Sequence, residues 1–280
     1  MNNSDFQLVC DLVKKRSGIV LSADKAYLVE SRLMPVCRKY RMGTLDDLAK
    51  KLRMGADEAL LSDITEAMTT NESSFFRDSR PFDLLRSEVL PKMIEARQAV
   101  RRIRIWSAAC SSGQEAYSAA MVLDEFAHKL AGWKIDIVGT DLSAEMVQKA
   151  RDGVYTQFEV QRGLPVTHLV KYFDQVGDKW QIKPDMRSRV NFRTFNLLEN
   201  MSSLGQFDIV FCRNVLIYFD QKTKATVLEG ISRQIPADGV LYLGGAETVL
   251  GITDRFKPVE GQRGLYAQNG PTEQGIRAVG

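Results

Sequence analysis

Polar and charged side chains follow four short apolar runs of this chain, at the points where each run ends. The first run, IRIWSAA, leads into ACSSGQEAYS, where Gly113 permits a tight turn and Glu115 begins a helical pattern. The segment lacks the GxGxxG spacing that cradles a pyrophosphate. A carboxylate here suits a cationic amino group, such as the one on S-adenosylmethionine; alternatively, Glu115 only stabilises the helix dipole.

The second and third runs also end in residues whose side chains could bind a nucleoside. GTDLS places Asp141 at a strand end, where a carboxylate can accept hydrogen bonds from both ribose hydroxyls of a nicotinamide dinucleotide or of S-adenosylmethionine. The alternative for Asp141 is an N-cap to the helix at Ser143. In FNLLEN, the Asn196 amide could read the adenine edge beside a backbone contact from Leu197, or simply form a turn.

The fourth run, FDIVFCRNVLIYF, ends in Arg213 and Asn214. A buried arginine costs free energy unless it is paired or used, so we expect a functional role for Arg213. If a helical turn begins at Asn214, then Tyr218 shares its face.

A further polar segment, TTNESSFFRD (residues 69–78), lies between helical patterns and ends near Arg77. Its density of polar and aromatic residues indicates a segment that closes over a ligand. The alternative is an ordinary loop packed by Phe75 and Phe76.

Alternating strand and helix patterns place these segments at one edge of a sheet. The four runs and GVLYLGG, separated in part by helical segments, predict a mostly parallel α/β sheet with right-handed crossovers. We expect this Rossmann-like domain at 101–280. A small insertion at about 155–190 contains a hairpin that turns near Gly177 and Asp178. The last residues, NGPTEQGIRAVG, read as a frayed tail.

Helical periodicity without strand signals predicts an all-α N-terminal domain at residues 1–75, followed by a linker with helical character at 76–100. Ser22 is a candidate N-cap for the second helix, which Pro35 should kink or break. A third helix should start at Gly43 and Thr44, and a fourth should run from about residue 57 to 68.

Composition excludes several classes of protein. The 280 residues carry a net charge of only +3, without the basic stripe of a nucleic-acid binder. Four cysteines and two histidines lack metal-ligand spacing, so we expect no metal and buried free thiols. The start is not a signal peptide, and no apolar run is long enough to span a membrane. We therefore expect a cytoplasmic protein, monomeric because no long apolar stripe is apparent.

Taken together, TTNESSFFRD, IWSAACSSGQEAYSAAM, GTDLS, FNLLEN and FDIVFCRNVLIYF resemble the CheR family of chemoreceptor glutamate methyltransferases, in the family's order. GIVLSADKAYLVESRL also matches. Where the family's first motif usually reads STGEEPYS, Gln114 and Ala116 differ here, but Glu115 is retained. The resemblance implies methyl transfer from S-adenosylmethionine to receptor glutamates, with S-adenosylhomocysteine as the second product. The residues that it implies for cofactor binding are Asn71, Ser73, Arg77, Glu115, Asp141, Asn196, Leu197, Arg213, Asn214 and Tyr218.

The resemblance also implies a partner, the cytoplasmic helical bundle of a methyl-accepting receptor. The basic second helix of the family corresponds to Arg32, Arg38, Lys39 and Arg41, which would meet glutamate-rich receptor helices; the alternative is a solvated surface. Some members tether to a receptor C-terminal pentapeptide through a hairpin insertion. The matching loop, QVGDKW, is short, so we expect no tether.

No general base is required, because a glutamate acceptor is already ionised at neutral pH, with an ordinary pKa of about 4.3. Arg77 and Tyr218 are the expected catalytic residues and would orient the carboxylate and the methyl group. Three rivals remain at this stage: a nicotinamide-dependent oxidoreductase, a non-catalytic module that binds S-adenosylmethionine, and a nucleic-acid methyltransferase. The absence of GxGxxG and of a catalytic histidine or lysine disfavours the first.

Overall fold

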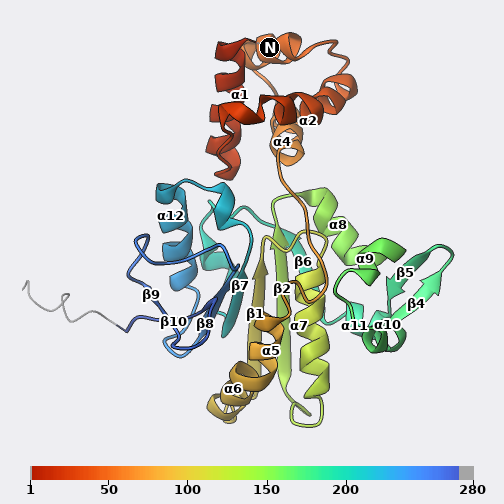
Figure 1. Cartoon of the computed structure of the whole chain (residues 1–280), viewed down its shortest axis with the longest axis vertical. Coiled ribbons are helices and arrows are strands. Elements are labelled where there is room, and N and C mark those ends of the chain that lie inside the picture. The colour runs from red at the N-terminus through yellow and green to blue at the C-terminus, as the bar shows by residue number, and fades with distance from the viewer. Residues whose placement is uncertain (1, 271–280) are drawn as a thin grey trace, which may run out of the picture. The chain divides into compact units, whose positions relative to one another are not determined.

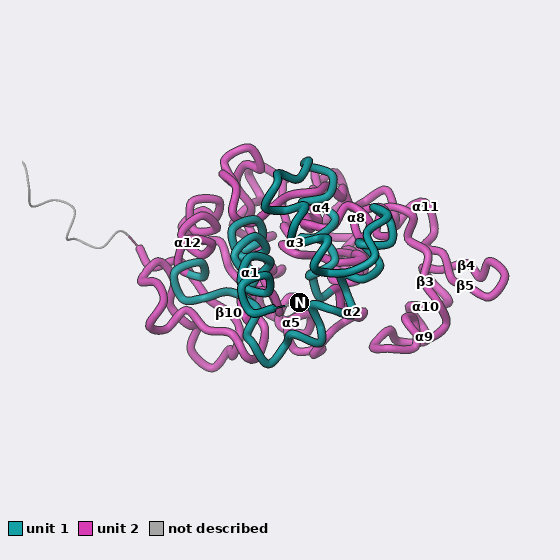
Figure 2. The backbone as a smooth tube through the Cα atoms, turned by 90° about the horizontal axis from the view of Figure 1, so that it is seen from above, with its two compact units in different colours: residues 1–70, 218–224 teal, residues 71–217, 225–280 magenta. Residues whose placement is uncertain are grey.

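The computed structural model describes residues 2–270 and divides the chain into two compact units (Figure 2). Unit 1 comprises residues 1–70 together with Tyr218–Lys224. Unit 2 comprises Asn71–Ile217 and the residues from Ala225 onward. The predicted tail falls almost entirely outside the described residues. Within residues 2–270, none of the helices combines the length and apolar character that a membrane crossing requires.

Unit 1 is built from helices (Figure 1). Their bounds are α1 Asn3–Ser17, η1 (a 3-10 turn) Ala23–Lys25, α2 Ala26–Lys39, α3 Leu45–Met54 and α4 Glu58–Ala67. The predicted third and fourth helices are confirmed. Thr44 closes a capping box with Asp47, and Asp57 accepts a hydrogen bond from Leu60 N at 2.9 Å.

Two expectations for the second helix are wrong. Ser22 precedes the 3-10 turn and makes no capping hydrogen bond to it, so it does not cap α2 directly. The helix also runs through Pro35 without a break. Pro35 and Ser31, whose carbonyl loses its helical donor, are both exposed, so water can satisfy the freed carbonyl.

Unit 2 contains a seven-stranded sheet in the order β6-β2-β1-β7-β8-β10-β9. The five predicted strands are confirmed as parallel neighbours: β1 Arg102–Ala108, β2 Lys134–Asp141, β6 Val190–Thr194, β7 Ile209–Cys212 and β8 Val240–Leu243. Two antiparallel strands, β9 Phe256–Pro258 and β10 Leu265–Gln268, complete it. These two were missed because FKP and LYAQ are short and partly polar, unlike the equally short but fully apolar runs of β7 and β8.

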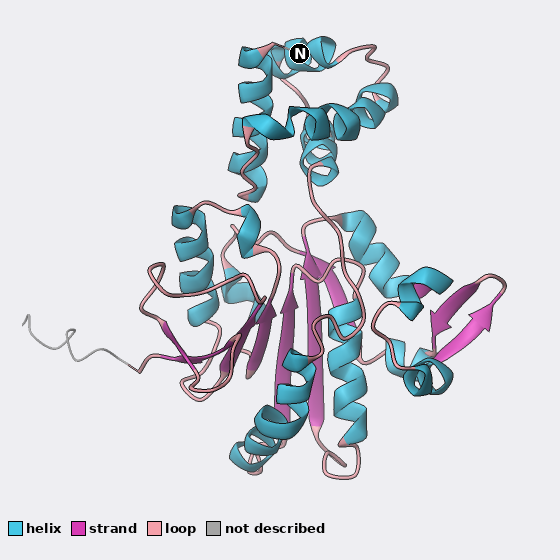
Figure 3. Ribbon diagram, in the orientation of Figure 1, coloured by secondary structure: helices cyan, strands magenta, loops and turns pink. Residues whose placement is uncertain are grey.

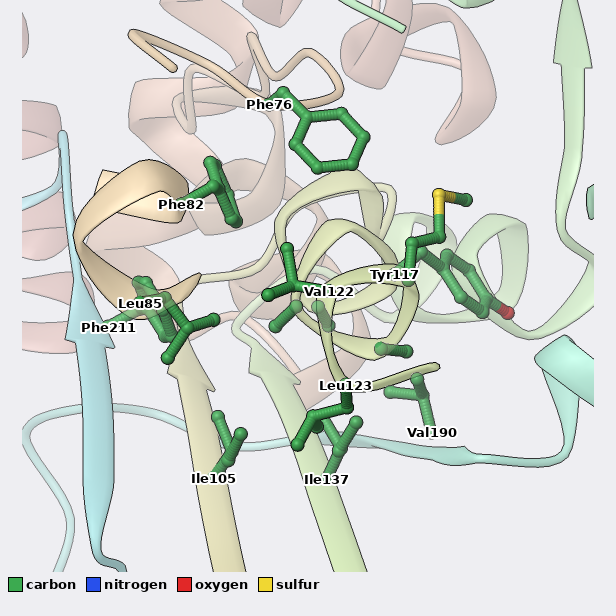
Figure 4. Close-up of a cluster of buried hydrophobic side chains, with 14 of the residues drawn as sticks. Phe76, Phe82, Leu85, Ile105, Tyr117, Val122, Leu123, Ile137, Val190 and Phe211 are labelled. Carbon is green, nitrogen blue, oxygen red and sulfur yellow. The ribbon is translucent and has the colours of Figure 1, made fainter. Parts of the chain in front are cut away.

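The helices of unit 2 pack on this sheet, with α5, α6 and α7 over one face (Figure 3). Their bounds are α5 Arg80–Leu84, η2 (a π-helical segment) Leu85–Val89, α6 Leu90–Ala96, α7 Gln114–Glu125 and α8 Ala144–Asp152, with the 3-10 turn η3 Met201–Leu204. The 3-10 turn η4 Leu216–Tyr218 and helix α12 Gln221–Ser232 belong to unit 2 except for their residues within Tyr218–Lys224, which belong to unit 1. The stretch expected as a helical linker is helical, and its Phe82, Leu85 and Leu90 are buried in the core of unit 2 together with Val122 and Phe211 (Figure 4).

The expected insertion forms a second, three-stranded sheet in the order β3-β5-β4. Its strands are β3 Val154–Thr156, β4 Phe173–Val176 and β5 Lys179–Ile182, accompanied by helices α9 Gln157–Gln161, α10 Val166–Tyr172 and α11 Pro184–Arg187. The hairpin β4–β5 turns at Gly177, at φ 62°, as predicted. The third strand, β3, was not predicted, because it is only three residues long.

Candidate active site

The strand order of unit 2 places a topological switch point between β1 and β7. From β1 the chain moves to β2 and β6 on one side, then returns to β7 on the other side of β1. Ligands of open α/β sheets bind outside the carboxyl ends of the strands at such a point. The residues that follow β1 and β7 are therefore the first candidates for a site.

Glu115 and Arg213 form an ion pair across this switch point. Arg213, which directly follows β7, donates from Nη1 to Glu115 Oε2 at 2.9 Å. Its Nη2 donates to Asp78 Oδ2 at 2.8 Å and to the Arg77 carbonyl at 2.9 Å. Glu115, in the first turn of α7, also accepts from Ser107 Oγ at 2.8 Å. The Arg213 side chain is only 1% exposed, so these partners offset the cost of burying its charge. Its expected functional role remains a prediction.

Gly113 sets the start of α7 for two reasons. Its φ is 92°, in the left-handed region that favours glycine, as the predicted tight turn requires. A Cβ there would also lie 2.8 Å from Ala150 Cβ and 2.9 Å from Phe192 Cζ. The glycine therefore lets α7 start close against α8 and β6, which fixes where Glu115 points.

Asp141 is buried at the end of β2 and holds two turns together. Its Oδ2 accepts from Ser111 N at 2.7 Å, and its Oδ1 accepts from Ser143 N at 2.9 Å. The N-cap of α8 is Ser143, which accepts from Met146 N, so the alternative role of Asp141 as that cap is wrong. Asp141 is therefore a hydrogen-bond acceptor at the carboxyl end of β2, and a role in binding a ribose remains a prediction.

Residues 71–78 are anchored on unit 2 at both ends. Ser111 Oγ donates to the Asn71 carbonyl at 2.9 Å, and Phe76 N donates to Ser118 Oγ at 2.9 Å. Phe75 and Phe76 are buried, so both form a packed aromatic anchor, as the alternative interpretation proposed. Phe75 packs edge-on against Tyr155 of β3, at 5.0 Å between ring centroids.

The polar residues of this segment are more open. Arg77 and Ser73 are half-buried, and Arg77 Nη1 donates to the Glu72 carbonyl at 3.0 Å. Residues Phe76, Asp78 and Ser79 adopt φ values of 48°, 64° and 40°. Such left-handed backbone costs free energy in residues other than glycine and clusters at functional sites.

Asn196 and Leu197 follow β6 beside Asp141. Phe195 N donates to the Asp141 carbonyl at 2.9 Å, which holds this loop at the strand ends. Asn196 Oδ1 accepts from Leu198 N at 3.1 Å, so Asn196 does form a turn, and Leu197 is buried. A role for Asn196 in reading adenine remains a prediction.

The condition under which Asn214 and Tyr218 would share a helical face is not met. Asn214 has a φ of 60°, so no right-handed helix begins there, and the 3-10 turn covers only Leu216–Tyr218. Tyr218 belongs to unit 1, where its carbonyl accepts from Val20 N at 2.9 Å. Its proposed catalytic role is therefore carried by resemblance alone.

Sequence reasoning missed two acidic residues of this region, Asp78 and Glu247. Asp78 pairs with Arg213, and the Glu247 carboxylate receives backbone N–H groups of the turn after β7. The sequence does carry a signal for Glu247, because this acidic residue lies two positions after GVLYLGG, at the end of the fifth predicted strand.

Of the four basic residues expected to dock a receptor, two already bind other groups of the chain through their side chains and two do not. Arg32 donates to the carbonyls of Met68 at 3.0 Å and Thr69 at 2.7 Å, and so caps the end of α4. Lys39 pairs with Asp63 at 2.6 Å. Arg38 and Arg41 are exposed, and their side chains form no hydrogen bond or ion pair within residues 2–270.

The described residues contain no cluster of acidic, histidine or cysteine side chains that could hold a metal ion. All four cysteines are free and buried, as expected. Burial raises the pKa of Cys110 and Cys212 well above the usual value for a thiol, so both stay protonated.

Comparison with known proteins covers both units. Residues 4–69 match the model of the CheR methyltransferase all-alpha domain, and residues 71–265 match that of the CheR methyltransferase SAM-binding domain. "Chemotaxis protein methyltransferase Cher2" of Pseudomonas putida is 41% identical over 95% of this chain and 98% of its own length. "Chemotaxis protein methyltransferase 1" of Pseudomonas aeruginosa is 42% identical over 94% of this chain and 97% of its own. The chain therefore belongs to the CheR family of methyltransferases, whose cofactor is S-adenosylmethionine.

Proposed function

We propose that this methyltransferase esterifies glutamate side chains in the cytoplasmic helices of chemotaxis receptors and acts there in adaptation of chemotaxis signalling. The family match over both units, with relatives named chemotaxis protein methyltransferases, carries the proposal. The products are glutamate methyl esters and S-adenosylhomocysteine. The proposal places the protein in the cytoplasm, as a monomer that meets the receptor's methylation helices.

The donor set at the strand ends suits S-adenosylmethionine. Glu115 and Asp141 are acidic and suit an ammonium group and ribose hydroxyls, whereas a phosphate would be repelled. Arg213 Nε is buried without a partner among residues 2–270, and a cofactor carboxylate would satisfy it. The proposed cofactor set is Asn71, Ser73, Arg77, Glu115, Asp141, Asn196, Leu197, Arg213, Asn214 and Tyr218.

The chemistry needs orientation more than proton transfer. When bound, S-adenosylmethionine supplies an electrophilic methyl group. A glutamate acceptor arrives ionised, since its ordinary pKa is about 4.3, so the chain has to provide no base. Arg77, with one N–H group on the Glu72 carbonyl, has others with which to hold the acceptor carboxylate. Positioning and exclusion of water would then supply most of the rate.

Docking on the receptor is assigned to unit 1. Of the four basic residues, Arg38 and Arg41 have guanidinium groups free to meet glutamate-rich helices. Arg32 and Lys39 already serve contacts inside unit 1, so their charges are less available. We infer that the exposed pair dominates receptor attraction.

No pentapeptide tether is included in the proposal. The hairpin β4–β5 joins its strands through only two residues, Gly177 and Asp178. Such a short turn supports independence from a receptor C-terminal tether.

The test is to incubate the purified chain with radiolabelled S-adenosylmethionine and a receptor cytoplasmic fragment, with and without the C-terminal pentapeptide. We expect base-labile label on the fragment, in equal amounts for both forms. Cofactor binding without transfer to any receptor would favour a regulatory module instead. Loss of transfer only on the shortened fragment would refute tether independence alone.

A further inference from the structure

A buried carboxylate lies behind the turn that carries Arg213 and Asn214. Glu247 is 8% exposed and lies beyond the end of β8. Its Oε2 accepts from Asn214 N at 2.8 Å and from Gly244 N at 2.7 Å. Its Oε1 accepts from Val215 N at 3.0 Å and from Ile217 N at 3.3 Å. A single side chain thus satisfies backbone groups from the ends of both β7 and β8.

The charge of Glu247 is balanced by the backbone alone. Within residues 2–270, no lysine or arginine pairs with it. Four N–H donors fill the lone-pair positions that a carboxylate offers, and converging backbone N–H groups form an anion-binding concavity. Hydrogen bonds to an ionised acceptor are roughly twice as strong as those between neutral groups. Glu247 therefore has a strong and specific hold on this turn.

The turn needs such a hold, because its backbone is unusual. Asn214 has a φ of 60°, and the N–H groups of Asn214, Val215 and Ile217 all donate to the Glu247 carboxylate. Gly244 leaves the space for this arrangement. A Cβ there would lie 2.7 Å from Glu247 Oε2 and 2.9 Å from Asn214 Nδ2.

We propose that Glu247 is a positioning residue for methyl transfer: it clamps the turn after β7 so that Arg213 and Asn214 present their side chains to the cofactor. This inference rests on the cofactor roles proposed above for these two residues. Glu247 acts through the backbone of the turn and need not touch cofactor or substrate itself.

The test compares Glu247→Gln with Asp208→Asn in the full chain. Glutamine keeps the shape of Glu247 but turns one acceptor into a donor that faces N–H groups. Asp208 is a matched control, because it is equally buried at the other end of β7 and accepts from Arg104 N at 2.8 Å. The readouts are the Kd for S-adenosylhomocysteine by calorimetry, the Tm, and amide hydrogen exchange at Asn214 and Val215.

We expect Glu247→Gln to raise the Kd about tenfold or more, equivalent to about 1.4 kcal/mol, and to unprotect both amides. Asp208→Asn should lower the Tm but change the Kd less than about twofold, because it leaves the carboxyl ends intact. A Glu247→Gln protein with a lowered Tm and an unchanged Kd would show a merely structural role and overturn the proposal.

Two further measurements keep the proposal testable if Glu247→Gln does not fold. Glu247→Asp retains the charge but is one methylene too short to reach all four donors, and it should raise the Kd by an intermediate factor. In the unmodified chain, the Asn214 and Val215 amides should be protected from exchange; rapid exchange there would also overturn the clamp. Failure of receptor methylation by the unmodified chain would refute the proposed acceptor, and the Kd comparison would still stand.

Discussion

For Arg213, the sequence indicates that the side chain needs partners, and the structure shows which residues these are. Its position at the end of an apolar run predicts that the guanidinium must be paired, because an isolated buried charge is too costly. Its acceptors, Glu115 and Asp78, lie 98 and 135 residues away in the sequence, and no local pattern names them. Likewise, Asp141 was expected to accept hydrogen bonds. The backbone donors Ser111 N and Ser143 N reach it only because the loops that carry them fold beside the end of β2.

Removal of Glu115 should be costly. Glu115→Ala leaves the buried Arg213 with Asp78 as its remaining carboxylate, so we expect the free energy of unfolding to fall by about 3 kcal/mol and cofactor affinity to drop. Chemical denaturation and calorimetry measure the two effects. The control is Glu125→Ala in the same helix, which loses the more open pairs with Arg86 and His168 and should cost about 1 kcal/mol or less. Equal losses in the two variants would contradict the importance assigned to the Glu115 pair.

Two glycine variants, at Gly113 and Gly177, distinguish the cost of backbone strain from that of steric overlap. Gly113→Ala imposes both, because φ is positive and its Cβ would meet Ala150 and Phe192, so we expect a loss of about 2–5 kcal/mol. Gly177→Ala, also at positive φ but with no atom within 4 Å of the new Cβ, should lose about 1–2 kcal/mol from strain alone. Denaturant titration of both variants gives the comparison; a smaller loss at Gly113 would be inconsistent with the close packing of α7.

At the scale of elements, the pattern of apolar residues was informative where a segment was continuously apolar or had a clear helical period. The five parallel strands and helices α3 and α4 were predicted from such patterns. The short strands β3, β9 and β10 are partly polar and gave no such signal, and the course of the turn at Asn214 depends on the distant carboxylate of Glu247. The helix does not break at Pro35, because solvent can donate to the carbonyl that proline leaves without a partner.

The exposed end of α2 carries the prediction about docking. Charge reversal by Arg38→Glu with Arg41→Glu should lower kcat/KM for receptor methylation about tenfold or more at low salt, because attraction to acidic helices is lost. The Kd for S-adenosylhomocysteine and the Tm should not change.

The matched control for this pair is Lys50→Glu with Lys51→Glu, which makes the same change in net charge at exposed positions in the second half of α3. It should affect methylation much less. If both pairs lower kcat/KM equally, attraction depends on net charge and no docking surface on α2 is needed.

At the scale of the whole molecule, the chain joins an all-helical unit to a methyltransferase sheet, and the family match spans both. Family membership rules out the rival oxidoreductase. The sequence motifs predicted the cofactor class because strand ends carry its binding chemistry, whereas the acceptor is carried by resemblance, since an ionised carboxylate demands no diagnostic base.

The acceptor is therefore the most direct test of the account. A receptor fragment should be methylated with the purified chain, digested, and mapped by mass spectrometry to locate each added methyl group. The account predicts methyl esters on glutamate side chains, removed by mild base, and no transfer by an Arg77→Ala variant that still folds. Methyl groups found on lysine, arginine or backbone nitrogen, stable to base, would contradict it.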